Sequence, residues 1–252
     1  KINSTSQQAI VSQGVSVTGT PSFWFKTNKL DVNLEQATVS SNGFFEGVTP
    51  IGAIKAGKMF MQMAADDRQI VFTNGVQLIY QPHKNWLGLF VRQILTLISI
   101  ILLTLNASFP AAAQTNLLLD SVSLNPNAPV NMTSDKLSIS QADGSARFEG
   151  NVVIGQGDMR ISAEVVIVTY LAEGGIDQLT ALGGVTFVTK TNEAESETAN
   201  YSLTNNTLVM NGNVLLKQGQ NAISAETMNV DLATGSAILT GRVRTVLKTS
   251  SN

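Results

Sequence analysis

A glycine-centred phrase recurs four times in the second half of this chain, and it constrains the fold more than any other feature. In each copy an apolar residue shortly precedes a Gly-x-Val triplet, and a second phrase of alternating character stands between successive copies. A two-strand unit that repeats about every 26 to 36 residues is typical of a repeat architecture, in which one unit cannot bury its apolar face alone. The copies of the first phrase are Phe148–Ile154, Leu182–Val188, Met210–Leu216 and Leu239–Thr245, and those of the second are Ser134–Ile139, Ala163–Val168, Ala199–Leu203 and Ala225–Val230.

Alternation with a period of two predicts that the second phrase forms β-strands. Met228, Val230 and Leu232 alternate with polar residues, which places apolar groups on one face and polar groups on the other. The runs 165–168 and 214–216 are apolar throughout, so they either lie deeper or show their second face to a partner. Each glycine suits a tight turn or a β-bulge. Because no window outside the central apolar segment has convincing helical periodicity, an all-β fold is predicted.

Composition excludes several classes of function. Only 13% of the 252 residues are charged, the net charge is −2, and the Lys and Arg residues are scattered, so no nucleic-acid partner is expected. The chain has no cysteine, which excludes disulfides and thiolate metal sites, and His83 is its single histidine. We therefore expect neither a metal nor another cofactor.

Residues 86–113 break the strand pattern. A basic stretch that ends at Arg92 precedes an apolar run over 94–105, and an Ala-x-Ala site follows at Ala111 to Ala113. These are the three parts of a secretory signal peptide, here in the middle of a chain. The apolar run is short for a membrane span, which needs about 20 residues. A buried core helix is the alternative interpretation.

The position of this hydrophobic segment leaves three interpretations open. It is cleaved after Ala113, it stays as an anchor with the first segment elsewhere, or two neighbouring reading frames are joined in this chain. We favour the joined frames, with 1–85 and 114–252 separate in the cell, because each looks complete at the joint. N-terminal sequencing of the mature product tests this, and a single uncleaved species would contradict it.

Residues 1–85 carry looser versions of the same phrases, which predicts the same kind of fold. Lys1 opens in mid-pattern, so we expect the N-terminal part of this segment to be missing. Met59, Met61 and Met63 alternate along one predicted strand, either as adaptable core filler or as the lining of a flexible apolar groove. The related phrases are Gly14–Gly19, Gly43–Val48, Ala56–Met61 and Val71–Tyr80.

With these motifs in view, residues 114–252 resemble the OstA-like family, which includes LptA, the periplasmic bridge protein of lipopolysaccharide (LPS) transport. Residues 1–85 resemble, over shorter and less specific stretches, the C-terminal part of its inner-membrane partner LptC, and the tandem order is similar to that of adjacent genes for this system. The first resemblance rests on Pro129–Leu137, Ala146–Gly157, Ile161–Val168, Leu208–Gly219 and Gly241–Leu247, and the second on Gly47–Met59 and Val71–Tyr80.

The resemblance implies a β-jellyroll, or folded taco, of stacked short antiparallel strands. It further implies a non-enzymatic protein of the Gram-negative periplasm, with the first segment tethered to the inner membrane. The implied partners are LPS, whose acyl chains enter an apolar groove, the inner-membrane LptC and transporter, the outer-membrane LptD, and further copies joined head to tail. Residues 242–247 and 117–124 are the candidate edge strands for such assembly.

The family supplies no catalytic motif, so groove residues must be chosen from the alternation in this sequence. The larger apolar residues on the strand faces are the candidates for lipid contact, with ordinary core packing as the alternative role for each. They are Val152, Ile154, Ile161, Val166, Val168, Phe187, Tyr201, Leu203, Leu208, Met210, Val214, Leu216, Ile223, Met228, Val230 and Ile238.

Two other classes of protein remain as alternatives. A parallel β-helix enzyme that degrades polysaccharides also shows glycine-punctuated strands, and Asp66-Asp67 or Glu193, Glu195 and Glu197 would be its paired carboxylates. The first pair is more typical of a turn and the second group of a solvated surface or loop. A structural β-scaffold, such as an adhesin or a filament, is the other alternative. Lipid that co-purifies with the protein would distinguish a carrier from a scaffold.

Overall fold

The computed structural model describes nine stretches of the chain. The hydrophobic segment predicted at 86–113 lies outside them, as do the candidate edge residues 119–124. Within the described stretches no helix occurs, and therefore none has the length and apolarity that a membrane crossing needs. The described residues are 2–3, 7–19, 23–49, 52–64, 67–82, 115–118, 128–140, 144–171 and 175–247.

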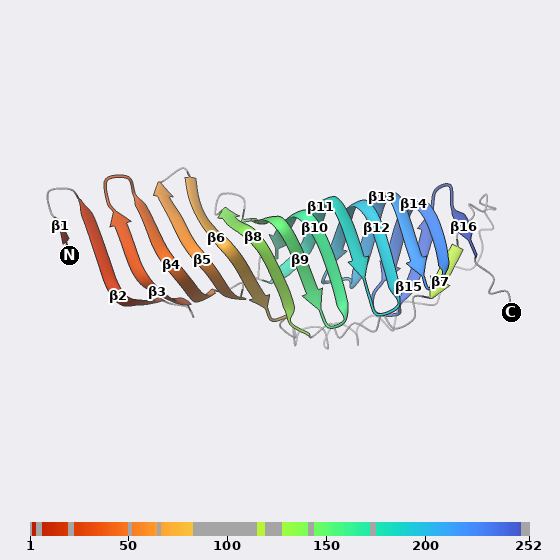
Figure 1. The fold of residues 1–252 in the computed structure, drawn as a ribbon, viewed down its shortest axis with the longest axis horizontal. Coiled ribbons are helices and arrows are strands. Elements are labelled where there is room, and N and C mark those ends of the chain that lie inside the picture. Colours follow the sequence, from red (N-terminus) through yellow and green to blue (C-terminus); the bar gives the residue numbers. More distant parts are fainter. Residues whose placement is uncertain are drawn as a thin grey trace, which may run out of the picture.

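In the described residues sixteen strands form one extended sheet, and the first and the last of these strands lie at its opposite ends (Figure 1). Neighbouring strands pair in the order β1 to β6, β8 to β15 and then β7, while β16 pairs with β14, and every described pairing is antiparallel. The all-β prediction is confirmed for these residues. The strands are β1 (Ile2–Asn3), β2 (Gln8–Gly19), β3 (Phe23–Asn33), β4 (Thr38–Thr49), β5 (Gly52–Ala64), β6 (Asp67–Tyr80), β7 (Thr115–Leu118), β8 (Val130–Ser140), β9 (Ala146–Gln156), β10 (Met159–Tyr170), β11 (Ile176–Val188), β12 (Asn192–Ser202), β13 (Thr207–Gln218), β14 (Asn221–Asp231), β15 (Ser236–Thr240) and β16 (Arg244–Val246).

In three of its four copies the recurring glycine lies in the middle of a strand, where it makes a bulge rather than a hairpin turn, and in the fourth Gly241 lies between β15 and β16. In β13 the pairing with β14 skips Gly212 and Asn213, whose φ angles are +82° and +48°. A shift of this kind interrupts every neighbouring pair from β2–β3 to β13–β14. Because a bulge bends its strand, bulges that line up across a sheet bend the whole sheet. Strands β2 to β6 and β8 to β14 are therefore long and bent near mid-length, whereas short strands were expected.

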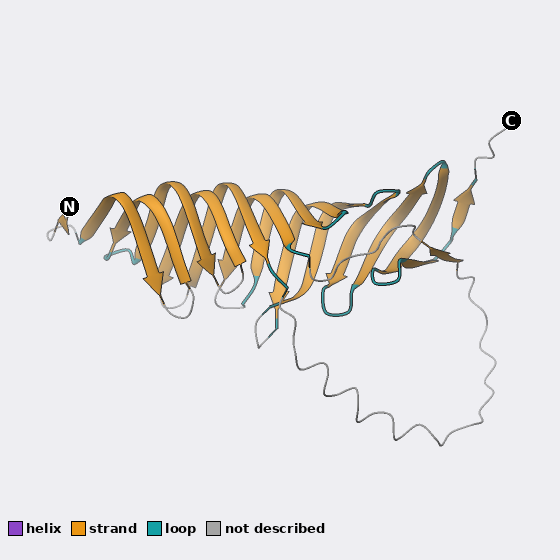
Figure 2. Ribbon diagram, turned by 90° about the horizontal axis from the view of Figure 1, so that it is seen from below, coloured by secondary structure: helices purple, strands orange, loops and turns teal. Residues whose placement is uncertain are grey.

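The aligned bulges form a crease that divides the sheet into two walls (Figure 2). We call wall A the side that contains residues 136–140 of β8 and 146–149 of β9, together with the half-strands in register with them. Wall B contains residues 130–134 of β8 and 152–156 of β9, with their partners. The outer ends of the walls, where the hairpins connect successive strands, are called the lips.

The inner face of each wall carries rows of residues in direct register, most of them apolar. Since side chains alternate between faces along a strand, such rows mean that the same face is apolar in strand after strand. One row on wall A is Val32, Val39, Met61, Ile70, Ile139, Ala146, Val168, Leu179, Tyr201, Leu208, Val230 and Ala237. One on wall B is Phe25, Gly47, Ile54, Leu78, Met132, Ile154, Ile161, Phe187, Ala194, Leu216 and Ile223.

The segments predicted as two β units share one sheet and one core. Strand β6 of the first segment pairs with β8 of the second from Gln69 opposite Ser140 to Tyr80 opposite Val130. The bulge in β6 lies opposite the bulge in β8, so the crease continues across this junction. A single cluster of buried apolar residues extends from Val15 in β2 to Leu239 in β15.

One candidate edge lies in a different place from the one expected. Residues 117–124 were expected at the start of the second segment, but Leu117 and Leu118 belong to β7, which pairs with β15 at the far end of the sheet. The start of the second segment is β8, which is already paired with β6. At the other candidate edge, β16 pairs with β14 on one side, and no described strand pairs with its other side.

Candidate functional site

The interior between the walls is the candidate site, and it holds most of the residues chosen from the sequence. Leu203 is half-buried and packs against this core. Ile238 is 36% exposed, because Ala237 and Leu239 are the residues of β15 that face inward. The other candidates are 5% exposed or less: Val152, Ile154, Ile161, Val166, Val168, Phe187, Tyr201, Leu208, Met210, Val214, Leu216, Ile223, Met228 and Val230. Their contact with lipid stays a prediction.

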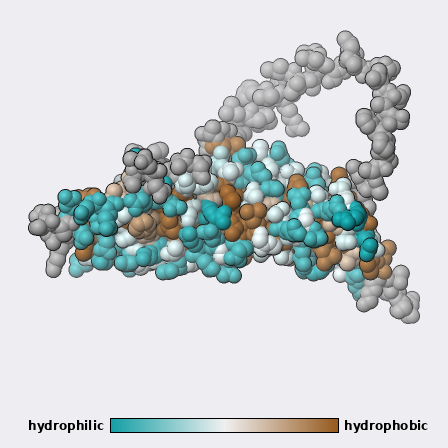
Figure 3. Space-filling model, turned by 90° about the horizontal axis from the view of Figure 1, so that it is seen from above, coloured by the Kyte–Doolittle hydropathy of each residue, from teal (hydrophilic) through white to brown (hydrophobic). Residues whose placement is uncertain are grey.

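The apolar runs 165–168 and 214–216 follow the same alternation as the other strands. Val166, Val168, Val214 and Leu216 face inward, whereas Leu215 and the other intervening residues are partly exposed on the outer face. The runs therefore do not lie deeper than the other strands, and contact of their outer face with a partner stays a prediction. The space-filling view shows an apolar patch near the middle of one face of the molecule (Figure 3).

The first segment contributes an interior of its own, which the sequence analysis did not resolve. Phe25, Phe45 and Phe72 lie in successive contact, with ring centroids 5.3 and 5.2 Å apart, and all three are buried. The signal for them was present as alternation around residues 25, 54 and 78, but it was weaker than in the second segment. Leu78 and its register neighbours Ile54 and Met132 are fully buried at the junction.

The interior is more open in the first segment than in the second. On wall A the row members Val32, Val39, Met61 and Ile70 are only partly buried, whereas Val168, Leu179, Leu208 and Val230 further along the same row are buried. A pocket of about 290 Å³ lies at the β5–β6 lip, lined by Met61, Gln62, Met63, Arg68, Gln69 and Ile70. Of the three alternating methionines, Met59 is buried in the core, whereas Met61 and Met63 line this pocket.

In the second segment, carboxylates cover the crease from outside. Glu197 in β12 lies over Gly212 and accepts a hydrogen bond from Asn213 Nδ2 at 2.6 Å. Asp135 and Glu226 make the equivalent contacts with Gly150–Asn151 and Gly241–Arg242, and Glu164 lies over Gly183. These acids therefore hold the bulged backbone in place.

The three glutamates considered for catalysis are held in ion pairs or hydrogen bonds on the outer face. Lys217 Nζ lies 3.1 Å from Glu193 Oε1 and 2.6 Å from Glu195 Oε1. The hydrogen bond from Lys217 lowers the pKa of Glu195, and Glu197 is held at the crease. Asp66 lies outside the described residues, and Asp67 begins β6. The antiparallel pairing also differs from that of the parallel β-helix considered as an alternative.

Two hydrogen bonds that involve tyrosine hydroxyls join the lip of wall A to the lip of wall B. Tyr201, near the end of β12 on wall A, donates a 2.6 Å hydrogen bond to Gln156 Oε1 at the end of β9 on wall B. Gln156 Nε2 in turn donates to the carbonyl of Ala128 at 3.2 Å. The Tyr80 hydroxyl, at the end of β6 on wall B, accepts a 3.3 Å hydrogen bond from the backbone N–H of Ile176 on wall A. Spacing in the sequence gave no signal for these contacts.

Burial makes Tyr201 and Tyr170, the last residue of β10, weaker acids than an exposed tyrosine. It raises the pKa of Tyr201 to about 12, and burial, with a smaller contribution from Tyr80, raises the pKa of Tyr170 above its usual value. In a spectrophotometric titration of the folded protein we expect both phenols to stay protonated at about pH 11, above the ordinary tyrosine pKa of about 10. Their folded pKa values are raised, so the stability they contribute is present below pH about 10 and is lost as pH rises toward 12. Titration of Tyr170 and Tyr201 near pH 10 without unfolding would contradict this.

These features define a class of protein: an extended antiparallel sheet, folded along a line of bulges, around a continuous apolar interior. Residues 131–236 match the family described as LptA/(LptD N-terminal domain) LPS transport protein. An uncharacterized protein of Rhizobium meliloti (strain 1021) is 32% identical over 160 residues, covering 59% of this chain and 86% of that protein. The crystal structure of LptH, the LptA-homologous periplasmic component of the LPS transport device of Pseudomonas aeruginosa, is similar with a TM-score of 0.45 and 19% identity, covering 50% of this chain and 99% of that one.

The chain contains a domain of the LptA/(LptD N-terminal domain) family of LPS transport proteins. The matched residues begin within β8 and end at the first residue of β15, so they contain the four carboxylates that cover the crease but not Gly241 and Arg242, which Glu226 contacts. Strands β1 to β6 lie outside the match to the family model.

Proposed function

We propose that this protein carries LPS without catalysing a reaction, by holding the acyl chains between walls A and B while the sugars stay in water. The observation that carries this proposal is the single apolar interior that continues across both segments and through the β6–β8 junction. Membership of an LPS transport family supports it.

The physical reason for such an interior is the cost of exposing acyl chains to water. At about 0.8 kcal/mol for each methylene, a chain of about 12 carbons costs on the order of 10 kcal/mol to expose. A molecule with several such chains does not cross an aqueous space by free diffusion. Rows of apolar side chains in register remove most of this cost at every step along the sheet.

We further propose that the first segment is LptC-like and that the protein acts in the periplasm of a Gram-negative cell, with this segment tethered to the inner membrane. The shared crease and the paired rows support a common fold for the two segments. Strand addition at the two ends of the sheet is the proposed mode of assembly with the inner-membrane transporter, with outer-membrane LptD and with further copies. Backbone groups on an unpaired strand edge favour such addition.

Photo-crosslinking tests the carrier function. With a photoreactive amino acid at Val168, Phe187 or Met228, we expect cross-links to LPS, because these side chains face the interior and are buried. Asn229 is the matched control, since it follows Met228 directly and is exposed on the outer face. Cross-links to LPS that are no stronger at the three interior positions than at Asn229 would contradict the carrier function and would favour a structural scaffold.

A further inference from the structure

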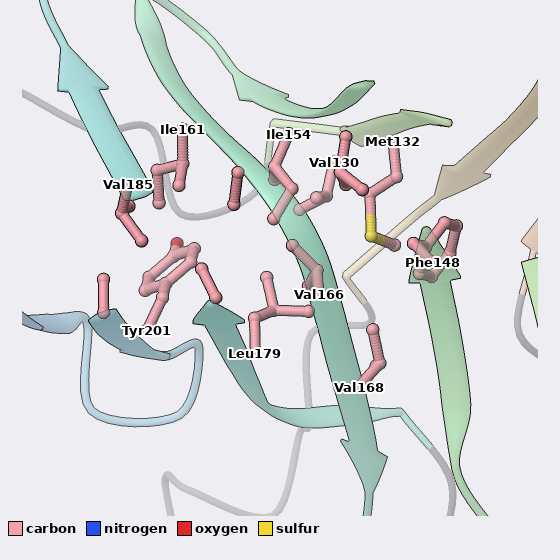
Figure 4. Close-up of a cluster of buried hydrophobic side chains, with 14 of the residues drawn as sticks. Val130, Met132, Phe148, Ile154, Ile161, Val166, Val168, Leu179, Val185 and Tyr201 are labelled. Carbon is pink, nitrogen blue, oxygen red and sulfur yellow. The ribbon is translucent and has the colours of Figure 1, made fainter. Parts of the chain in front are cut away.

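All three tyrosines of the chain lie at the lips. Tyr80 is the last residue of β6, Tyr170 the last of β10 and Tyr201 the last but one of β12. In the close-up, the Tyr201 ring lies beside Leu179 and points toward Ile161 and Val185 of wall B (Figure 4). The hydroxyl thus reaches from wall A to wall B at the lips.

We propose that the Tyr201–Gln156 hydrogen bond is a latch between the lips, and that acyl chains enter the interior sideways when it opens. The proposal rests on the carrier function proposed above. Both partners are 2% exposed, and they come from different walls and from strands three apart in the sheet. The bond from Gln156 to Ala128 continues the polar contact toward the start of β8.

A buried hydrogen bond suits a contact that must open. When the lips separate, water replaces each lost partner, so the net free-energy difference between closed and open is small. In the closed state, by contrast, either group left alone would be a buried polar group without a partner, which is costly. The bond therefore makes partly closed arrangements unfavourable and favours two states, closed with the bond made or open with both groups in water.

Tyr170 provides a matched control on the same lip. Its hydroxyl is buried, and no hydrogen-bond partner is found for it among the described residues. Replacement by phenylalanine at Tyr201 and at Tyr170 removes the same atom, but only the first change removes a bond between the walls. A second control is Asn213→Ala, which removes a hydrogen bond to Glu197 at the crease and leaves the lips unchanged.

Two measurements on the full chain test the latch. The first is amide hydrogen exchange without ligand, compared at 154–156 and 176–179 on the lips and at 211–214 on the crease. The second is the stopped-flow rate at which the protein takes up a dansyl-labelled undecanoic acid. For Tyr201→Phe and for Gln156→Met we expect both lip exchange and uptake to rise about two- to tenfold, as the loss of one hydrogen bond implies. The double variant should add little to either single change.

The controls decide between a latch and general loosening. Tyr170→Phe and Asn213→Ala should leave lip exchange and uptake close to those of the unchanged protein. Unaltered lip exchange in Tyr201→Phe, or an equal rise in Asn213→Ala, would overturn the latch. If lip exchange rises as expected but no form of the protein binds the probe or LPS, the latch between the walls is supported and the carrier function, with the sideways entry that depends on it, is refuted.

Discussion

Gly212→Ala is expected to lower the free energy of unfolding by about 2–5 kcal/mol, because two costs add at this position. The residue has φ +82°, which an L side chain adopts only with strain, and an added Cβ would lie 2.5 Å from Glu197 Oε2 and 2.9 Å from its Cβ. The second contact involves the base of the Glu197 side chain, so rotation of the carboxylate does not relieve it. Urea unfolding, followed by circular dichroism, measures the change.

Gly75→Ala is the matched control for this prediction. Gly75 lies at the same crease in β6 and has φ +78°, but an added Cβ would meet no atom within 4 Å. Only the backbone strain remains, so the expected loss is about 1–2 kcal/mol. Equal losses at the two glycines would mean that the carboxylate over the crease contributes nothing to the effect.

Leu78→Asp is expected to cost about 3–5 kcal/mol and to separate the unfolding of the two segments. Leu78 is fully buried in β6, between the fully buried apolar residues Ile54 of β5 and Met132 of β8. The two segments are joined by one pair of strands, β6 and β8. A destabilising change there is therefore expected to weaken the coupling between the segments more than it lowers the stability of either segment alone. Thermal unfolding of the variant should then show two transitions where the unchanged protein shows one.

Gln77→Asp is the control for the junction, since Gln77 is the next residue in β6 and lies on the outer face. Its amide donates a hydrogen bond to Asn131 Oδ1 at 3.2 Å, in an exposed place where water can substitute. We expect a loss of less than about 1 kcal/mol and a single transition. Two transitions in both variants would show that charge in β6, rather than burial at the junction, separates the segments.

The fold class and most of the interior could be predicted because they depend on local patterns. Alternation in 225–232 gives the inward face of β14, and Gly-x-Val gives the bulge, since both are properties of a few consecutive residues. The outward direction of the Ile238 side chain could not be predicted in this way. Ala237, Ile238 and Leu239 are all apolar, so a period of two does not decide which of them points inward.

Other features depend on pairing between distant residues and have no local signal. The crease requires the bulges of successive strands to fall in register, which is set by strand pairing and not by any one repeat. The position of β7 beside β15 joins residues more than a hundred positions apart in the chain. The Tyr201–Gln156 bond likewise joins two strands that are not neighbours in the sheet. Conserved spacing within a repeat carries no information about such contacts.

The rows in register have a consequence for the direction of movement. One apolar side chain follows another at nearly equal intervals along both walls, and neither the crease nor the row pattern changes at the β6–β8 junction. Within the second segment, where both rows are buried, a hydrocarbon chain between these walls would therefore meet a nearly level free-energy profile, with no internal step that drives it one way. On such a profile the net movement of acyl chains depends only on how the sites along the sheet are filled. Loading at one end of the sheet and removal at the other would therefore set the direction of transport.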